Sequence, residues 1–183
     1  MNALVWYVAY GSNLSQERFA CYLQGGQPAG ARRSYPGCRD RTPPREVVGL
    51  RIPGRVRFGG LSRVWGGGLA FLDSEADGEV VARGYLIGAD QLDEVFALER
   101  RYDTQSKVGD RDGLPMVALT SSEHHEPAAP SAAYLRTILS GLTDGLLEVD
   151  AAITYLLSAP GVDLRWDDAG LRELAEQPAP GRG

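Results

Sequence analysis

An acid lies where a predicted helix should carry an apolar residue. Over residues 89–101, Leu92, Val95, Phe96 and Glu99 recur at the i, i+3, i+4 and i+7 spacing of one helical face. A helix C-terminus disfavours negative charge, and burial opposes ionisation of a carboxyl group. Glu99 is therefore either held by an arginine or poised, with a raised pKa, to accept and return a proton near neutral pH. Three arginines could hold it: Arg63, Arg100 and Arg101.

A second candidate lies near the N-terminus, where the apolar run LVWYVAY stops at Gly-Ser-Asn. Gly11 can adopt backbone conformations that other residues avoid, and Ser12 and Asn13 tolerate turns. The amides of residues 11–14 would then point outward and attract a carboxylate or a developing oxyanion. The simpler interpretation is a strand–turn–helix connection with Ser15 as the helix N-cap.

These candidates must be positioned by alternating strands and helices. Residues 4–10 predict a strand buried on both faces, because apolar residues occupy both sides of its alternation. It is followed by a helix that ends near residues 24–26. Further strands are expected at residues 47–52, 55–58, 69–72, 80–87 and 116–120, and further helices at 89–101, 131–141, 149–159 and 171–176. Residues 102–113 are polar and predict a loop that covers the site.

The connection after the first helix is rich in Gly, Pro and Arg and predicts a long loop. Its arginines are Arg32, Arg33, Arg39, Arg41 and Arg45. Arginine-dense loops contact phosphates, but this one lacks lysine, regular spacing and a set of stacking aromatics, so no nucleic-acid partner is expected. A solvated or internally paired loop is the simpler interpretation. Alternatively, one or two of these arginines face substrate carboxylates.

Composition is typical of one ordinary globular domain. The 183 residues are 43% apolar, which suffices for a buried core. We expect a single domain over residues 1–160 and a C-terminal extension with a frayed tail over residues 161–183. No apolar run approaches the roughly 20 residues of a membrane span, so a cytoplasmic protein without membrane contact is expected.

Neither the cysteines nor the histidines predict a metal site. Cys21 and Cys38 lack metal-ligand spacing and are expected as reduced thiols. His124 and His125 are adjacent on a polar loop, where solvated side chains are the usual outcome. A homodimer is compatible with the sequence, although nothing in the sequence shows one.

Three sequence blocks, in order, resemble the γ-glutamylcyclotransferase-like family, which includes the γ-glutamylamine cyclotransferases and BtrG-type enzymes. The first is YGSNL, from Tyr10 to Leu14, and the third is PSAAYLRTILSG, which contains Tyr134. The second block is matched by Ser62, Arg63, Trp65, Gly67, Gly68 and Ala70. Together the blocks span most of the chain.

The resemblance implies an α+β fold in which a small mixed β-barrel is flanked by helices. It implies an enzyme that cyclises a small-molecule γ-glutamyl substrate to 5-oxoproline without a cofactor. Glu99, seven residues after Leu92, takes the place of the catalytic acid. The implied substrate-binding residues are Tyr10, Gly11, Ser12, Asn13, Leu14, Arg63, Gly68 and Tyr134.

One departure from the family pattern keeps other functions open. Arg100 stands where the family usually has glycine after the acid. A non-catalytic metabolite-binding module on the same fold is therefore the alternative. Acyl transfer to a bound acceptor amine is a third option.

Overall fold

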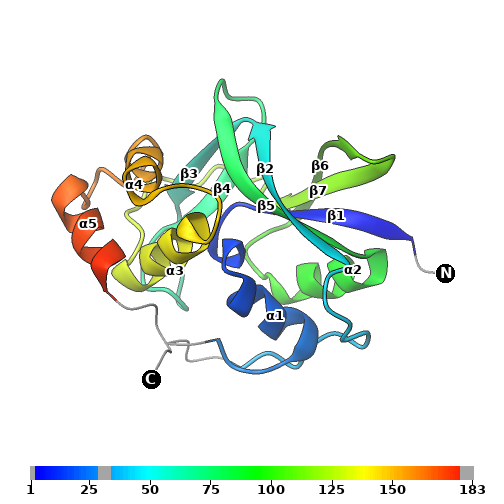
Figure 1. Ribbon diagram of the computed structural model, residues 1–183. Coiled ribbons are helices and arrows are strands. Elements are labelled where there is room, and N and C mark those ends of the chain that lie inside the picture. Colours follow the sequence, from blue (N-terminus) through cyan, green and yellow to red (C-terminus); the bar gives the residue numbers. More distant parts are fainter. Residues whose placement is uncertain (1–2, 29–33, 178–183) are drawn as a thin grey trace.

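The computed structural model describes residues 3–28 and 34–177 of the chain. Five strands form one mixed sheet in the order β2-β5-β1-β7-β6 (Figure 1). Their bounds are Leu4–Ala9 (β1), Glu46–Pro53 (β2), Glu79–Gly88 (β5), Thr104–Arg111 (β6) and Leu114–Thr120 (β7). A separate two-stranded ribbon joins Arg55–Gly59 (β3) and Leu69–Asp73 (β4).

Strand β1 occupies the centre of the large sheet. It pairs antiparallel with β5 along its whole length and parallel with β7. Its residues from Val5 to Ala9 are all buried, because helices and strands cover both faces. The prediction of a strand buried on both faces is confirmed. Because β1 is central, the turn that follows it lies in the middle of the molecule.

The helices divide between the two faces of this sheet. Gln16–Gln24 (α1) and Ala89–Leu98 (α2) pack on one face, where Phe19 and Val95 share a core with Tyr7. Ala132–Thr143 (α3), Val149–Leu157 (α4) and Asp168–Glu176 (α5) pack against one another and gather at one end of the molecule (Figure 1).

The α+β class is confirmed. The resemblance also implied a closed β-barrel. Within residues 3–28 and 34–177 the strands form an open five-stranded sheet and a separate two-stranded ribbon, so a closed barrel is not shown. Helix α5 lies in the stretch expected as a C-terminal extension. Its Leu171 and Leu174 are buried in the same core as α3 and α4. The expected frayed tail at residues 178–183 lies outside the described residues.

The prediction of a covering loop over residues 102–113 is wrong. Most of this segment is β6, which pairs antiparallel with β7. As an edge strand, β6 carries polar side chains and is specified by its turn rather than by apolar alternation. The turn is Asp112-Gly113, both at positive φ (53° and 75°), a dipeptide that favours tight hairpins.

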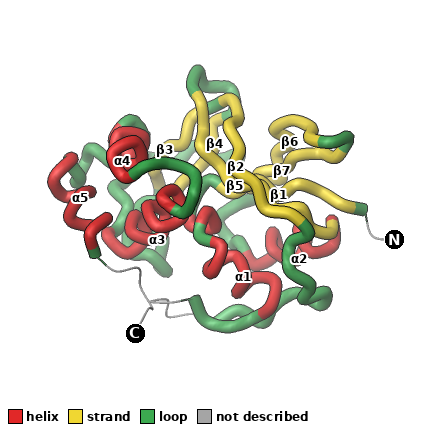
Figure 2. Tube along the Cα trace, viewed as in Figure 1, coloured by secondary structure: helices red, strands yellow, loops and turns green. Residues whose placement is uncertain are grey.

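The described parts of the connection between α1 and β2 pass below both helices and rise to β2 (Figure 2). The side chain of Gln91 in α2 donates to the carbonyls of Asp40 (2.9 Å) and Thr42 (3.0 Å). Arg39 pairs with Glu94, and Arg41 donates to the Pro36 carbonyl. These arginines are thus internally bonded, whereas Arg32 and Arg33 lie outside the described residues. None of the described helices is long and apolar enough to cross a membrane.

Candidate functional site

The turn after β1 is a single 3-10 turn, Ser12–Leu14 (η1), that leads directly into α1. Ser15 caps α1 by accepting a hydrogen bond from the Arg18 amide, as predicted. The Leu14 amide donates to the Gly11 carbonyl (3.0 Å), so it does not belong to the predicted outward row. The amides of residues 11–13 come before the first hydrogen bond of the turn and have no acceptor within it, and an outward direction for them stays a prediction.

Glu99 ends α2 as its C-cap instead of lying within the helix. Its amide donates to the carbonyls of Val95 and Phe96, which fixes its backbone. Its Oε1 accepts hydrogen bonds from the Tyr22 hydroxyl at 2.7 Å and from Asn13 Nδ2 at 3.4 Å. The half-buried carboxylate is thereby joined to α1 and to the turn after β1.

The hydroxyl groups around this carboxylate remain protonated. Burial, and next the negative charge of Glu99, raise the pKa of Tyr22 well above its ordinary value. The same two causes raise the pKa of Tyr7, whose hydroxyl accepts from Asn13 Nδ2 at 3.0 Å. Tyr22 is therefore a neutral hydrogen-bond donor to Glu99 throughout the physiological pH range.

A buried arginine that sequence reasoning missed lies beside this pair. Arg18 is 5% exposed, and its Nε donates to Ser12 Oγ at 2.9 Å. Its Nη2 donates to the hydroxyls of Tyr22 (3.4 Å) and Tyr35 (3.1 Å), and its guanidinium lies 4.8 Å from the centre of the Trp65 ring. Burial lowers the pKa of Arg18, but the surrounding tyrosines and Glu99 raise this pKa by more than burial lowers it. Arg18 therefore stays charged.

These groups line a pocket of about 350 Å³ between α1, the end of α2 and the segment at residues 62–69. Aromatic side chains form much of its wall. Tyr134 is buried and its hydroxyl accepts from the Ala70 amide, while the Tyr102 hydroxyl donates to the Ala70 carbonyl. The lining residues are Ser12, Arg18, Tyr22, Tyr35, Ser62, Arg63, Val64, Trp65, Leu69, Leu98, Glu99, Arg100, Arg101, Tyr102 and Tyr134.

The expected site residues divide into two groups. Ser12, Arg63, Glu99 and Tyr134 line the pocket, and Asn13 bonds to Glu99. Gly11 lies so close to Tyr134 that an added Cβ would be 3.1 Å from its hydroxyl oxygen.

The other expected residues lie outside the pocket wall and support it. The Tyr10 hydroxyl donates to the Leu119 carbonyl in the core (2.6 Å). Leu14 is fully buried against α3. A Cβ at Gly68 would lie 2.0 Å from the Ala128 carbonyl oxygen, so glycine is needed there for two backbones to approach.

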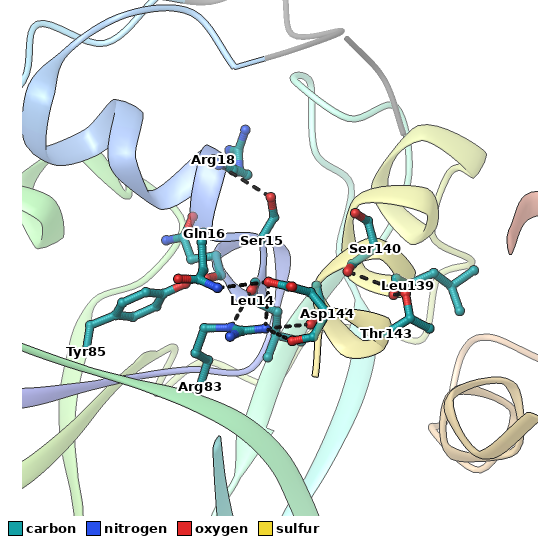
Figure 3. Close-up of polar contacts among 12 residues, drawn as sticks. Leu14, Ser15, Gln16, Arg18, Arg83, Tyr85, Leu139, Ser140, Thr143 and Asp144 are labelled. Carbon is teal, nitrogen blue, oxygen red and sulfur yellow. Dashed lines mark hydrogen bonds and ion pairs between the residues drawn. The ribbon is translucent and has the colours of Figure 1, made fainter. Parts of the chain in front are cut away.

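A buried arginine on β5 fixes the far end of the turn. Arg83 Nε donates to the Leu14 carbonyl at 2.9 Å, and Nη2 donates to the carbonyls of Gly141 (2.9 Å) and Asp144 (2.7 Å). Its guanidinium points between the turn and the end of α3, and the Asp144 carboxylate lies 3.3 Å away (Figure 3). Arg83 thus ties the turn that contacts Glu99 to the helix that carries Tyr134.

No group of three or more metal-ligating side chains occurs among residues 3–28 and 34–177. His124 is exposed as expected, whereas His125 is half-buried, stacks on Phe71 and contacts Ser121 Oγ through Nε2. Cys21 and Cys38 are free thiols.

Solved structures share this architecture. A structure named gamma-glutamyl cyclotransferase matches with a TM-score of 0.58 and 22% identity, covering 83% of this chain and 86% of its own. The chain has the γ-glutamyl cyclotransferase fold. The uncharacterized protein loc79017 from Homo sapiens shares this γ-glutamyl cyclotransferase-like architecture with a TM-score of 0.61 and 19% identity, covering 95% of this chain and 99% of its own. YkqA from Bacillus subtilis matches with a TM-score of 0.52 and 20% identity, covering 86% of this chain and 55% of its own.

Sequence comparison adds one partial match. Histone deacetylase 5 of Arabidopsis thaliana is 38% identical over an alignment of 119 residues that covers 62% of this chain. The match spans only 18% of that protein's length. No family model matches the chain.

Proposed function

We propose that this protein cyclises a γ-glutamyl compound to 5-oxoproline and releases an amine or amino acid. The observation that carries the proposal is Glu99, a half-buried carboxylate in the wall of a 350 Å³ pocket, fixed by Tyr22 at 2.7 Å. The fold shared with a γ-glutamyl cyclotransferase supports the same reaction class.

The reaction requires little beyond positioning and proton transfer. The substrate carries its own nucleophile, because its α-amine can close a five-membered ring onto the γ-carbonyl carbon. Holding the two groups together exploits the large effective molarity of an intramolecular attack. A pocket with one proton-transferring group and an anion-binding wall therefore suffices.

Glu99 moves the protons. Its carboxylate accepts a proton from the α-ammonium group, and the freed amine attacks the γ-carbonyl carbon to form the ring C–N bond. When the bond to the leaving nitrogen breaks, Glu99 passes this proton to that nitrogen and becomes a carboxylate again. The carboxylate then takes the second proton from the ring nitrogen and hands it to the released amine, which leaves as an ammonium ion. The hydrogen bonds from Tyr22 and Asn13 hold the carboxylate in one orientation during both transfers.

The opposite wall would bind the anionic parts of the glutamyl group. Ser12 lines the pocket, so its hydroxyl and the amides of residues 11–13 in the same turn would supply the donors, and Arg18 adds a buried positive charge. Such groups stabilise a carboxylate or a developing oxyanion. Tyr134 would limit the depth of the pocket, and Arg63 would meet the substrate near the entrance. Tyr10, Leu14 and Gly68 would act by holding these walls in place.

A non-catalytic metabolite-binding module is the second candidate. Arg100, which lines the pocket directly after Glu99, is the observation that favours it, because a bulky cation beside the acid could block turnover. A binding module would retain a γ-glutamyl compound unchanged, whereas an enzyme converts it.

The test is incubation of the purified protein with γ-glutamyl amino acids and γ-glutamylamines, followed by mass spectrometry of both products. We expect 5-oxoproline and the free amine in equal amounts. Calorimetric binding without 5-oxoproline would favour the binding module. Appearance of a new γ-glutamyl compound with an added acceptor amine, without 5-oxoproline, would favour acyl transfer.

A further inference from the structure

The pocket holds far more positive than negative charge. Its described lining residues include four arginines and a single carboxylate, Glu99, in a protein whose net charge is −5. Arg18 is buried at the inner wall, whereas Arg63, Arg100 and Arg101 are exposed. The cationic groups are thus arranged as one inner arginine and three at the entrance.

Two chain segments bring the entrance arginines together. Arg100 and Arg101 follow Glu99 at the end of α2, and Arg63 belongs to the segment before β4. The Arg101 guanidinium donates to the carbonyl of Leu61, which joins the two segments. Within residues 3–28 and 34–177, no salt bridge involves any of these three arginines.

A γ-glutamyl group alone does not match this charge. Its α-ammonium would face Glu99 under the proposed function, and its α-carboxylate would face the turn and Arg18. Both charges of the glutamyl part are then matched at the inner wall. The three entrance arginines line the exposed part of the same pocket, and the leaving amine would lie there, because buried Tyr134 closes the inner wall.

We infer that the preferred leaving amine carries at least two negative charges, as an acidic amino acid does, and that Arg63, Arg100 and Arg101 determine this specificity. Guanidinium groups suit this role, because they bind carboxylates through planar, paired hydrogen bonds and remain charged. The inference rests on the proposed function, since it assigns the glutamyl group to the inner wall. The inference also gives Arg100 a function beside Glu99, namely binding a carboxylate of the leaving amine.

The sharpest test is an isosteric substrate pair, γ-glutamyl-aspartate and γ-glutamyl-asparagine, which differ by one negative charge at nearly constant shape. We expect kcat/KM for 5-oxoproline release to be about fivefold or more higher for the aspartate compound at low salt, the order of effect of one partly exposed ion pair. The ratio should approach one as salt is raised, because salt screens exposed charges.

Variants assign the preference to residues. Arg100→Gln and Arg101→Gln should each lower the ratio, and the triple variant with Arg63→Gln should bring it to about one. Arg55→Gln is the matched control, because Arg55 is exposed on β3 and does not line this pocket. A ratio that survives the triple variant, or one that Arg55→Gln lowers equally, would overturn the assignment.

A binding measurement separates this inference from the proposed function. Calorimetry with the Glu99→Gln protein should show tighter binding of γ-glutamyl-aspartate than of γ-glutamyl-asparagine, whether or not turnover occurs in the wild type. Equal turnover and equal affinity for the two compounds would overturn the inference and leave the proposed cyclisation standing. Preferential binding of the aspartate compound without 5-oxoproline would overturn the cyclisation and leave the charge preference standing. Absence of binding and of turnover for both would overturn both.

Discussion

The Tyr22 hydroxyl lies 2.7 Å from Oε1 of Glu99, although 77 residues separate them in the chain. This hydrogen bond joins the last turn of α1 to the end of α2 across the wall of the pocket. A protonated phenol beside a carboxylate holds it in one orientation and stabilises its charged form.

Replacing Tyr22 with Phe should slow the reaction without unfolding the protein. Loss of a hydrogen bond to a charged group costs about 1.5–3 kcal/mol, so kcat/KM should fall by roughly 10-fold to 100-fold. The measurement is 5-oxoproline release under steady-state conditions. Tyr155→Phe is the control, because Tyr155 lies on α4 outside this pocket, and it should retain wild-type kinetics. An unchanged rate for Tyr22→Phe would remove this hydrogen bond from the mechanism.

Arg83→Met should destabilise the fold and loosen the turn after β1. The substitution leaves the buried carbonyls of Leu14 and Gly141 without their donor, at about 1–3 kcal/mol each. We therefore expect the free energy of unfolding, measured by urea denaturation, to fall by about 2 kcal/mol or more. Arg51→Met removes a surface arginine paired with Glu79 and should cost less than about 1 kcal/mol. Similar losses in the two variants would contradict the anchoring role of Arg83.

Cys38 should make stability fall at alkaline pH. Burial, and next the charges of Glu94 and Asp40, raise the pKa of this thiol to about 11. The folded state therefore holds a proton that the unfolded state loses above pH 8.5 or so, and stability declines as pH rises from there toward 11. Between pH 7.5 and 9.5 we expect the unfolding free energy to drop by about 1 kcal/mol more in the wild type than in Cys38→Ala. Parallel pH profiles for the two proteins would refute this assignment.

Much of the fold could be predicted because its elements carry a strong apolar period. The apolar run before Tyr10 predicted the strand that is β1, and the helical spacing from Leu92 to Phe96 predicted the helix that is α2. Strand β6 could not be found in this way, because an edge strand exposes alternate side chains and takes its hydrogen bonds from β7. The Asp112-Gly113 turn was the one local signal for it.

The candidate site could be predicted in part: the residues themselves pointed to Glu99 and to the turn with Ser12, and the family resemblance added Arg63 and Tyr134. Glu99 interrupts an apolar face, and the structure places it in the pocket wall. Arg18 gave a weaker signal, namely an arginine four residues before Tyr22 on the face that also buries Phe19. Its contact with Ser12 is local, but Tyr35 and Trp65 belong to two other segments of the chain, and no spacing rule predicts that they meet Arg18.

The proposed function requires Glu99 to transfer the protons of an intramolecular cyclisation. It is tested by the 5-oxoproline release rate of Glu99→Gln with a γ-glutamyl substrate that the wild type converts, beside Glu94→Gln, the same change within α2 and outside the pocket. We expect at least a 100-fold loss for Glu99→Gln, because a general acid–base is removed, with the circular dichroism of the folded wild type and near-normal turnover for Glu94→Gln. A folded Glu99→Gln protein that releases 5-oxoproline at the wild-type rate would contradict it.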